Sequence, residues 1–212
     1  MLITIKPTEL NKLIPAVGTG NQFREALGSP SKILQRTLVA AIGGIAAFLV
    51  STLFGNTFDS LSIVFILYLL WGPILEASRK NAKLKRFNHV AIFDGQIADI
   101  YTKDKIENRH EQADKRGSLE IVENRRTWLF LELSDSDGYL GRIKFPFDKK
   151  HENIRVGMKI RCLIFSNNRD FIKVDALSDA WLPQSRLWVG EYPYLLRPAF
   201  EELCLLRFSR FN

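Results

Sequence analysis

Cysteine and histidine are scarce in this sequence, which limits the chemistry available to it. The chain has 212 residues, with two cysteines and three histidines. Cys162 and Cys204 lie far apart, and neither has a histidine or a second cysteine at the spacing of a metal-binding or redox motif. We therefore expect two free thiols rather than a disulfide bond.

The three histidines, His89, His110 and His151, are scattered rather than grouped. His110 is followed by Glu111, as in a zinc-protease helix, but Asp114 stands where the second histidine ligand is needed. We therefore predict no metal site, no catalytic residues and no enzymatic activity. No cofactor is predicted either, although a bound chlorophyll, carotenoid or lipid stays open.

Charge is almost absent from residues 37–75, where Asp59 carries the only charged side chain. As a helix, residues 37–58 would be about 33 Å long, enough to cross a hydrocarbon core of about 30 Å. Residues 60–75 would reach only about 24 Å, and the next few residues can extend them toward the headgroups. We predict a two-helix transmembrane hairpin over residues 37–78. The alternative is a helical pair buried in a soluble core.

Small residues recur on one face of the first predicted helix, at Ala40, Gly44 and Ala47. This spacing lets two helices approach closely in lipid. The face is predicted to be a helix-packing interface, either with the second helix of the same chain or with another membrane protein.

Basic residues gather just after the second predicted helix, where lysine and arginine favour the cytoplasmic side of a membrane. Both termini are therefore expected on the cytoplasmic or stromal side, with residues 1–36 as a short lead. The same residues would attract anionic lipid headgroups. They are Arg79, Lys80, Lys83, Lys85 and Arg86.

Residues 88–177 contain short runs of β-branched and aromatic residues separated by turns, which predicts a small antiparallel β-barrel of the OB or SH3-like kind. The charged stretch 102–116 is expected to be an exposed loop or a short helix. The predicted fold is thus a membrane helical hairpin followed by a small β-barrel.

Residues 178–212 are rich in aromatic residues and proline. This tail either wraps over the barrel or forms an exposed recognition strip, because tryptophan, tyrosine and arginine supply most interface hot spots. In the second interpretation the partner interface consists of Trp188, Tyr192, Tyr194 and Arg197.

Three sequence motifs are distinctive in combination: WGP at 71–73, LEIVENR at 119–125, and LWVGEYPYL at 187–195 followed by FEE at 200–202. They resemble a small membrane-protein family of cyanobacteria and plastids whose members often carry the label phosphate ABC transporter permease. The resemblance implies an oxygenic phototroph and the thylakoid membrane. The transporter label does not fit, because an importer permease needs more helices and a coupling helix for its ATPase.

We therefore expect a non-enzymatic accessory or assembly factor of a photosynthetic membrane protein complex, such as a photosystem, in contact with the lipid bilayer. The alternative is a transport- or channel-related homo-oligomer. A membrane-tethered nucleic-acid binder ranks last, although the net charge is +7, because much of that charge sits beside the membrane. The predicted strands also lack the alternation of aromatic and basic residues that such a surface uses, so no nucleic-acid partner is expected.

Overall fold

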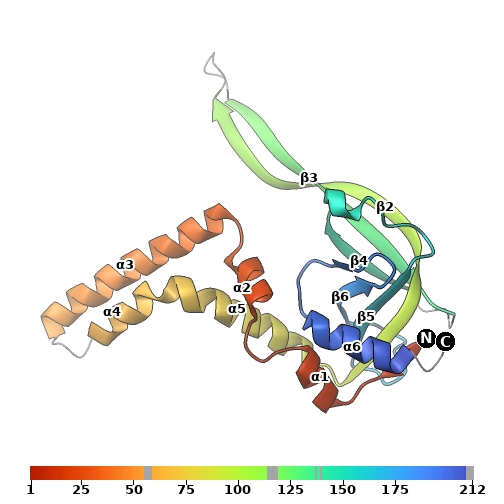
Figure 1. Ribbon diagram of the computed structural model, residues 1–212. Helices are drawn as coiled ribbons and strands as arrows, with labels where there is room; N and C mark the ends of the chain where they lie inside the picture. The colour runs from red at the N-terminus through yellow and green to blue at the C-terminus, as the bar shows by residue number, and fades with distance from the viewer. Residues whose placement is uncertain (55–58, 114–118, 137, 139, 209–212) are drawn as a thin grey trace. The chain divides into compact units, whose positions relative to one another are not determined.

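The computed structural model describes residues 1–54, 59–113, 119–136, 138 and 140–208 (Figure 1). The chain forms two compact units. The sheet unit comprises Met1–Lys6 and Phe87–Glu191, and the helical unit comprises Pro7–Arg86 and Tyr192–Asn212.

The sheet unit is built on a seven-stranded antiparallel sheet with strand order β4-β3-β2-β5-β6-β7 and with β1 paired to β2. Strand β2 is shared between two partners, because its first part pairs with β5 and its longer remainder pairs with β3. The elements are β1 (Leu2–Thr4), β2 (His89–Ala113), β3 (Leu119–Ser134), β4 (Leu140–Pro146), a 3-10 helix η2 (Lys149–His151), β5 (Lys159–Ser166), β6 (Ala176–Leu182) and β7 (Leu187–Val189).

The core of the sheet unit follows the two-residue period of its strands. In β3, Leu129, Leu131 and Leu133 are buried, while the residues between them point to the other face and are partly exposed. Phe93 of β2 and Phe145 of β4 are almost fully buried in the same cluster. In β3, therefore, one face packs into the core and the other is left partly exposed, whereas β5 is buried along almost its whole length.

The sheet is open, so the predicted closed barrel over residues 88–177 is wrong. A barrel closes when the strands at its two ends pair, whereas here β4 and β7 stand at opposite ends of the strand order. The far part of β2 instead continues along β3 as a two-stranded ribbon (Figure 1), paired as far as Ala113 with Leu119. Residues 102–113 were expected in a loop or helix, and they are strand because β3 supplies main-chain partners along their length.

The helical unit collects helices from the whole chain. Its buried residues include Leu13, Ile14, Ala77, Phe200 and Cys204, so the C-terminal segment packs in the same core as the first helix. The helices are α1 (Pro7–Leu13), α2 (Gly20–Leu27), α3 (Pro30–Phe54), α4 (Asp59–Ile66), α5 (Tyr68–Leu84) and α6 (Arg197–Phe208).

A buried amide pair joins three segments of this unit. Gln22 of α2 and Asn81 of α5 hydrogen-bond each other reciprocally, at 3.2 and 2.8 Å. Gln22 Nε2 also donates to the carbonyls of Pro193 and Tyr194, and Asn81 Nδ2 donates to the carbonyl of Pro15. Because buried polar groups are costly when unpaired, these bonds favour one arrangement of α2, α5 and the C-terminal segment.

The predicted two-helix transmembrane hairpin is also wrong. One helix of the described chain, Pro30–Leu53, is long and apolar enough by itself to cross a membrane. The second apolar segment is broken, because Ser60–Ile66 and Tyr68–Leu84 meet at an angle of 68°. The break lies at Leu67, ahead of Gly72 and Pro73, although proline is the commonest cause of a sharp bend in a helix.

At this break the side chain of Trp71 replaces a main-chain hydrogen bond that a continuous helix would make. Its indole nitrogen donates to the carbonyl oxygen of Val64 at 2.9 Å. In a continuous helix that carbonyl would accept from Tyr68, which is instead the first residue of α5. The same indole also packs edge-on against the Tyr68 ring, at 5.0 Å between centroids. These contacts stabilise a bend that proline did not cause.

Candidate functional site

Helix α3 exposes an unusual amount of apolar surface. Only 17% of the most apolar stretch within Pro30–Leu53 is buried in the structure, whereas a core helix of a soluble protein would be mostly covered. A soluble monomer rarely exposes a continuous apolar patch larger than a few hundred Å². We call the exposed apolar surface of α3, α4 and the first half of α5 the apolar arm. Its residues include Leu34, Leu38, Val39, Ile42, Ile45, Phe48, Leu49, Leu53, Ile63, Val64, Ile66 and Leu70.

The small-residue face of α3 lies against α4. Ala40, Gly44 and Ala47 are buried, in contrast to the apolar residues around them. A Cβ added to the neighbouring Gly43 would lie 2.3 Å from the ring of Phe65 in α4, so the two helix backbones approach closely there. Of the two partners considered for this face, the structure places the chain's own α4 on it.

The five basic residues after the apolar stretch lie in different surroundings at the end of α5. Arg79, Lys83 and Arg86 are exposed. Lys80 forms an ion pair with Glu76 at 3.2 Å and lies over the ring of Tyr192, 4.5 Å from its centroid. The remaining residue of the group, Lys85, donates to Asn11 Oδ1 at 2.9 Å.

The C-terminal aromatic residues are largely packed inside their own units. Tyr192 is 6% exposed, and its ring meets that of Tyr194 edge-on at 4.7 Å. Burial, and then the neighbouring Tyr194 and Glu76, hold the pKa of Tyr192 well above its usual value. Trp188 pairs with Trp181 across β7 and β6, and both Trp188 and Arg197 are partly buried. These four residues therefore do not form the exposed recognition strip described as one interpretation of the tail.

A different surface carries half-buried aromatic side chains together with exposed basic ones. On the outer face of β2 and β3, Tyr101 lies opposite Phe130, and Lys103 lies opposite Trp128. The rings of Tyr101 and Phe130 stack with a centroid separation of 5.1 Å and an interplanar angle of 3°. Lys103 lies over both rings, and Lys105 lies over Trp128 at 5.3 Å. We call these five residues the aromatic–basic face.

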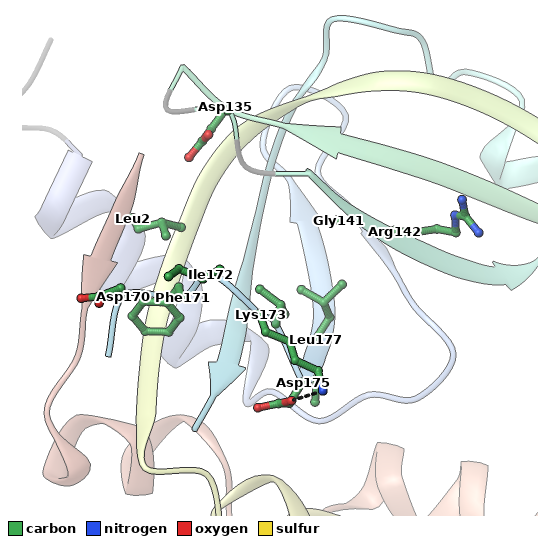
Figure 2. Close-up of a pocket in the computed structure, with 13 residues that line it drawn as sticks. Leu2, Asp135, Gly141, Arg142, Asp170, Phe171, Ile172, Lys173, Asp175 and Leu177 are labelled. Atoms are coloured by element: carbon green, nitrogen blue, oxygen red, sulfur yellow. Dashed lines mark ion pairs between the residues drawn. The ribbon is translucent and has the colours of Figure 1, made fainter. Parts of the chain in front are cut away.

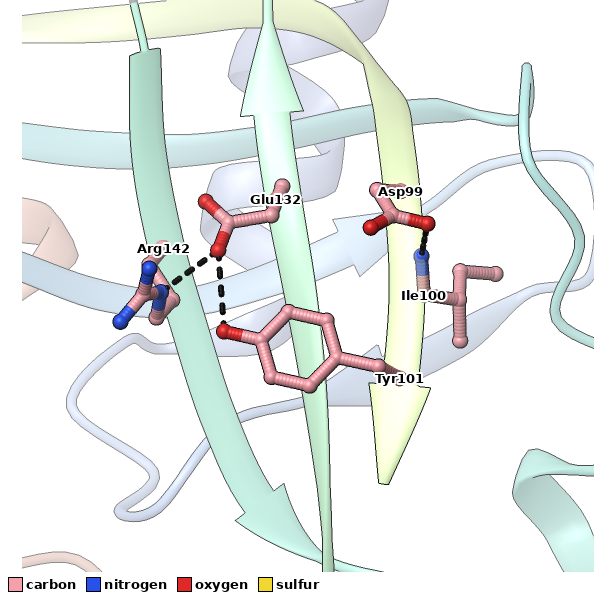
Figure 3. Close-up of polar contacts among 5 residues, drawn as sticks. All are labelled: Asp99, Ile100, Tyr101, Glu132 and Arg142. Carbon is pink, nitrogen blue, oxygen red and sulfur yellow. Dashed lines mark hydrogen bonds and ion pairs between the residues drawn. The ribbon is translucent and has the colours of Figure 1, made fainter. Parts of the chain in front are cut away.

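An ion pair orders one end of the aromatic–basic face (Figure 3). Glu132 of β3 accepts a hydrogen bond from the Tyr101 hydroxyl at 3.0 Å and another from Arg142 Nε of β4 at 2.7 Å. Partial desolvation and the hydrogen bond to Glu132 raise the pKa of Tyr101. The phenol therefore stays neutral at physiological pH, so it acts as a hydrogen-bond donor that orients the ring.

The aromatic–basic face is positively charged, because Lys103 and Lys105 are the charged residues among its five members. By contrast, Arg126 beside them pairs with Glu107. The indole nitrogen of Trp128 is buried and has no hydrogen-bond partner among the described residues. The face thus combines stacked rings and lysines, which suits a partner with negative charge.

The sheet unit has an open groove of about 940 Å³ (Figure 2). Leu2, Phe171 and Leu177 give it apolar walls, while Asp170 and Asp175 contribute carboxylates. Phe171 adopts a φ of 51°, which is uncommon for a bulky residue. The mixture of apolar walls and scattered charge is typical of a contact surface and gives no arrangement of nucleophile and base.

Within the part of the chain that the structure describes, no three histidine, cysteine, aspartate or glutamate side chains gather in a way that could hold a metal ion. Cys162 and Cys204 are buried as free thiols. His151 is also buried, accepts a hydrogen bond from the Asp148 amide at 3.0 Å, and packs against Phe145. Burial lowers the pKa of His151, which keeps the ring neutral in its acceptor role.

Comparison with known proteins gives one match. Residues 3–207 match a family of unknown function, DUF8619. The chain belongs to this family. No curated protein and no solved structure matches it. Membership of DUF8619 therefore covers both units, but it carries no activity, ligand or partner with it.

Reasoning from the sequence missed the aromatic–basic face of this DUF8619 protein because the five residues of the face come from two different strands. Along β2 the order is Tyr101, Lys103, Lys105, and the remaining rings come from β3. The available signal was the two-residue spacing of Lys103 and Lys105 after an aromatic residue. That signal becomes visible only if the charged stretch is recognised as a strand.

Proposed function

We propose that this protein is a non-catalytic accessory protein of a membrane protein complex, held at a bilayer by the apolar arm. The observation that carries the proposal is the exposure of α3, a helix of membrane-crossing length whose most apolar window is only 17% buried. Burying that much apolar surface in lipid removes its contact with water, at about 25 cal/mol per Å².

The arm also determines on which side its flanks lie. Helix α2 precedes α3 and is bonded to α5 through Gln22 and Asn81. Because α2 and α5 are bonded to each other, both lie on one side of the bilayer in this proposal, and α3 is the helix that is embedded in the lipid. The exposed basic residues Arg79, Lys83 and Arg86 mark that side as cytoplasmic or stromal.

The partner would be bound through the aromatic–basic face. Its lysines suit an acidic surface on a neighbouring protein. The β2–β3 ribbon continues beyond the rest of the sheet, and an isolated two-stranded ribbon is only marginally stable in water. A partner that covers the ribbon would therefore stabilise it as well. The resemblance to cyanobacterial and plastid membrane proteins directs the search to photosynthetic complexes, the photosystems first.

The test is co-purification after mild detergent extraction, with native-gel migration and mass spectrometry of the band. The variant Lys103→Glu with Lys105→Glu reverses the charge of the face. We expect it to lose the partner while staying in the membrane fraction, and to migrate as a small species. The control is Lys149→Glu with Lys150→Glu, the same charge change at exposed residues of η2, which should keep the partner. Equal loss in both variants would contradict the proposal.

A second function is favoured by one observation. Stacked rings interleaved with lysines are also the features that hold single-stranded nucleic acid, and the structure has them across β2 and β3. The same variant decides between the two functions. Salt-dependent binding of a fluorescent single-stranded oligonucleotide, lost in the Lys103→Glu and Lys105→Glu variant, would favour a membrane-tethered nucleic-acid binder.

A homo-oligomeric channel has less support. The small-residue face proposed to join its copies is already covered by α4. No polar pathway follows from one crossing helix.

A further inference from the structure

The polar end of the apolar arm contains a small cavity with more positive than negative charge. It has a volume of about 270 Å³ and is lined by Lys32, Gln35, Arg36, Val39, Tyr68 and Glu76, from α3 and from the first turns of α5. Arg36 directly precedes the uncharged run that begins at Thr37. If the arm is inserted as proposed, the cavity lies at the level of the lipid headgroups.

Glu76 is the carboxylate of this cavity, and it serves two cations at once. Arg36 Nη2 donates to Glu76 Oε2 at 2.6 Å, and Lys80 Nζ lies 3.2 Å from Glu76 Oε1. Both carboxylate oxygens are thus engaged. Lys32 lies one helical turn before Arg36 and adds a third positive charge.

Arg36 has a donor left over. Its side chain is only 12% exposed, and its Nη1 atom is buried without a hydrogen-bond partner among the described residues. An unpaired charged donor in such a position costs free energy. A guanidinium presents its nitrogens as a fork that suits two oxygens of a phosphate. The Nη2 atom of Arg36 donates to Glu76, and the Nη1 atom has no acceptor among the described residues.

We propose that this cavity binds the phosphate of an anionic phospholipid, with the guanidinium of Arg36 and the amine of Lys32 as the donors. The apolar wall begins within the cavity at Val39 and continues along the exposed side chains of α3, where the acyl chains would lie. An aromatic pair, Tyr68 and Trp71, stands on α5 near the same level, as is usual at a membrane interface. The inference rests on the proposed membrane insertion and adds the class of lipid that the arm selects.

The experiment measures lipid binding to the full chain purified in a neutral detergent. Short-chain phosphatidylglycerol, short-chain phosphatidylcholine and inorganic phosphate are each titrated, and bound ligand is counted by native mass spectrometry. We expect saturable binding of one phosphatidylglycerol, at least about tenfold tighter than phosphatidylcholine, because the choline headgroup carries no net charge. Equal binding of the two lipids would overturn the proposal, and equally tight inorganic phosphate would assign the site to a free anion.

Two variants should change the affinity in opposite directions. Arg36→Gln removes the donor and should weaken phosphatidylglycerol binding at least about tenfold. Glu76→Gln removes the competing carboxylate and should strengthen it. Lys83→Gln removes an exposed charge elsewhere on α5 and should have no effect. If Arg36→Gln does not fold, Lys32→Gln at an exposed position is the alternative, with a weaker but measurable loss.

Membrane insertion is scored separately, by resistance to alkaline extraction. Insertion without a preference for the anionic lipid would overturn only the phosphate site. Extraction of the wild-type chain would overturn the proposed function.

Discussion

At the scale of single residues, stability depends on buried polar groups whose hydrogen bonds are met within the fold. Gln22 and Asn81 bond each other and nearby main-chain groups, so the loss of either side chain would leave the other without its amide partner. His151 has a similar role in the sheet unit, because its neutral ring accepts the Asp148 amide. The sequence analysis gave neither amide a role and found no function for His151. The local sequence does not show which segments of the chain come into contact, so the partners of these side chains could not be predicted.

His151 should make stability depend on pH. Burial lowers its folded-state pKa below the unfolded value of about 6.5, so the unfolded chain binds the proton more readily. The contribution of the neutral ring is complete above about pH 6.5 and is lost as the pH falls toward the folded pKa. Thermal unfolding between pH 7.5 and 5 should show a falling midpoint, and His151→Gln should reduce this dependence. An unchanged dependence in that variant, with His89→Gln as control, would contradict the role of His151.

At the scale of elements, the spacing of small residues decided which helix faces meet. The face of Ala40, Gly44 and Ala47 is covered by α4, and Gly43 lets the Phe65 ring approach the α3 backbone. The strand pairing of β2 was not predictable in the same way. Its charged far part has no apolar alternation to mark it, and it becomes a strand by bonding with β3.

Gly43→Ala should destabilise the helical unit. The new methyl would lie 2.3 Å from the Phe65 ring, and overpacking of this kind costs about 1–3 kcal/mol. Alanine is the better helix former by up to about 1 kcal/mol, so a net loss shows that the α3–α4 contact outweighs helix propensity. The measurement is the thermal midpoint in detergent. Ala46→Val, an addition at an exposed position of α3, should leave the midpoint nearly unchanged.

At the scale of the whole molecule, one chain combines an apolar helical surface with a polar sheet, and this division of surfaces is the basis of the proposed anchoring. The family match covers residues 3–207, but only the surfaces indicate what each unit contacts. The exposure of the apolar arm makes the proposal testable. A charged side chain placed on the arm is costly in lipid but is well solvated in water.

Two lysines in the middle of α3, Ile42→Lys with Ile45→Lys, should release the protein from the membrane. Both isoleucines are exposed, at 60% and 62%, so the change disturbs little internal packing. A lysine at the centre of a membrane helix costs about 2.5–3.5 kcal/mol. Alkaline extraction should move this variant into the soluble fraction or prevent its accumulation in membranes. Ile172→Lys, at an 86% exposed position of the sheet unit, is the control; if both variants stay in the membrane, α3 is not the anchor.

The sequence by itself determined the features that depend on local composition and period. These include the apolar stretch around α3, its small-residue face, the antiparallel strands after residue 88 and the two free cysteines. Each follows from residues close in the chain, whose hydrophobicity and spacing act without distant partners.

Only the tertiary structure decided the features that depend on partners far apart in the chain. The sheet stays open, and most of β2 pairs with β3 in a long ribbon. The second apolar segment bends at Leu67, where the Trp71 indole donates a hydrogen bond to the Val64 carbonyl. The aromatic–basic face and the Arg36 cavity likewise join side chains from separate elements. Main-chain hydrogen bonds and ion pairs of this kind are chosen by the fold as a whole, so no local pattern of residues specifies them.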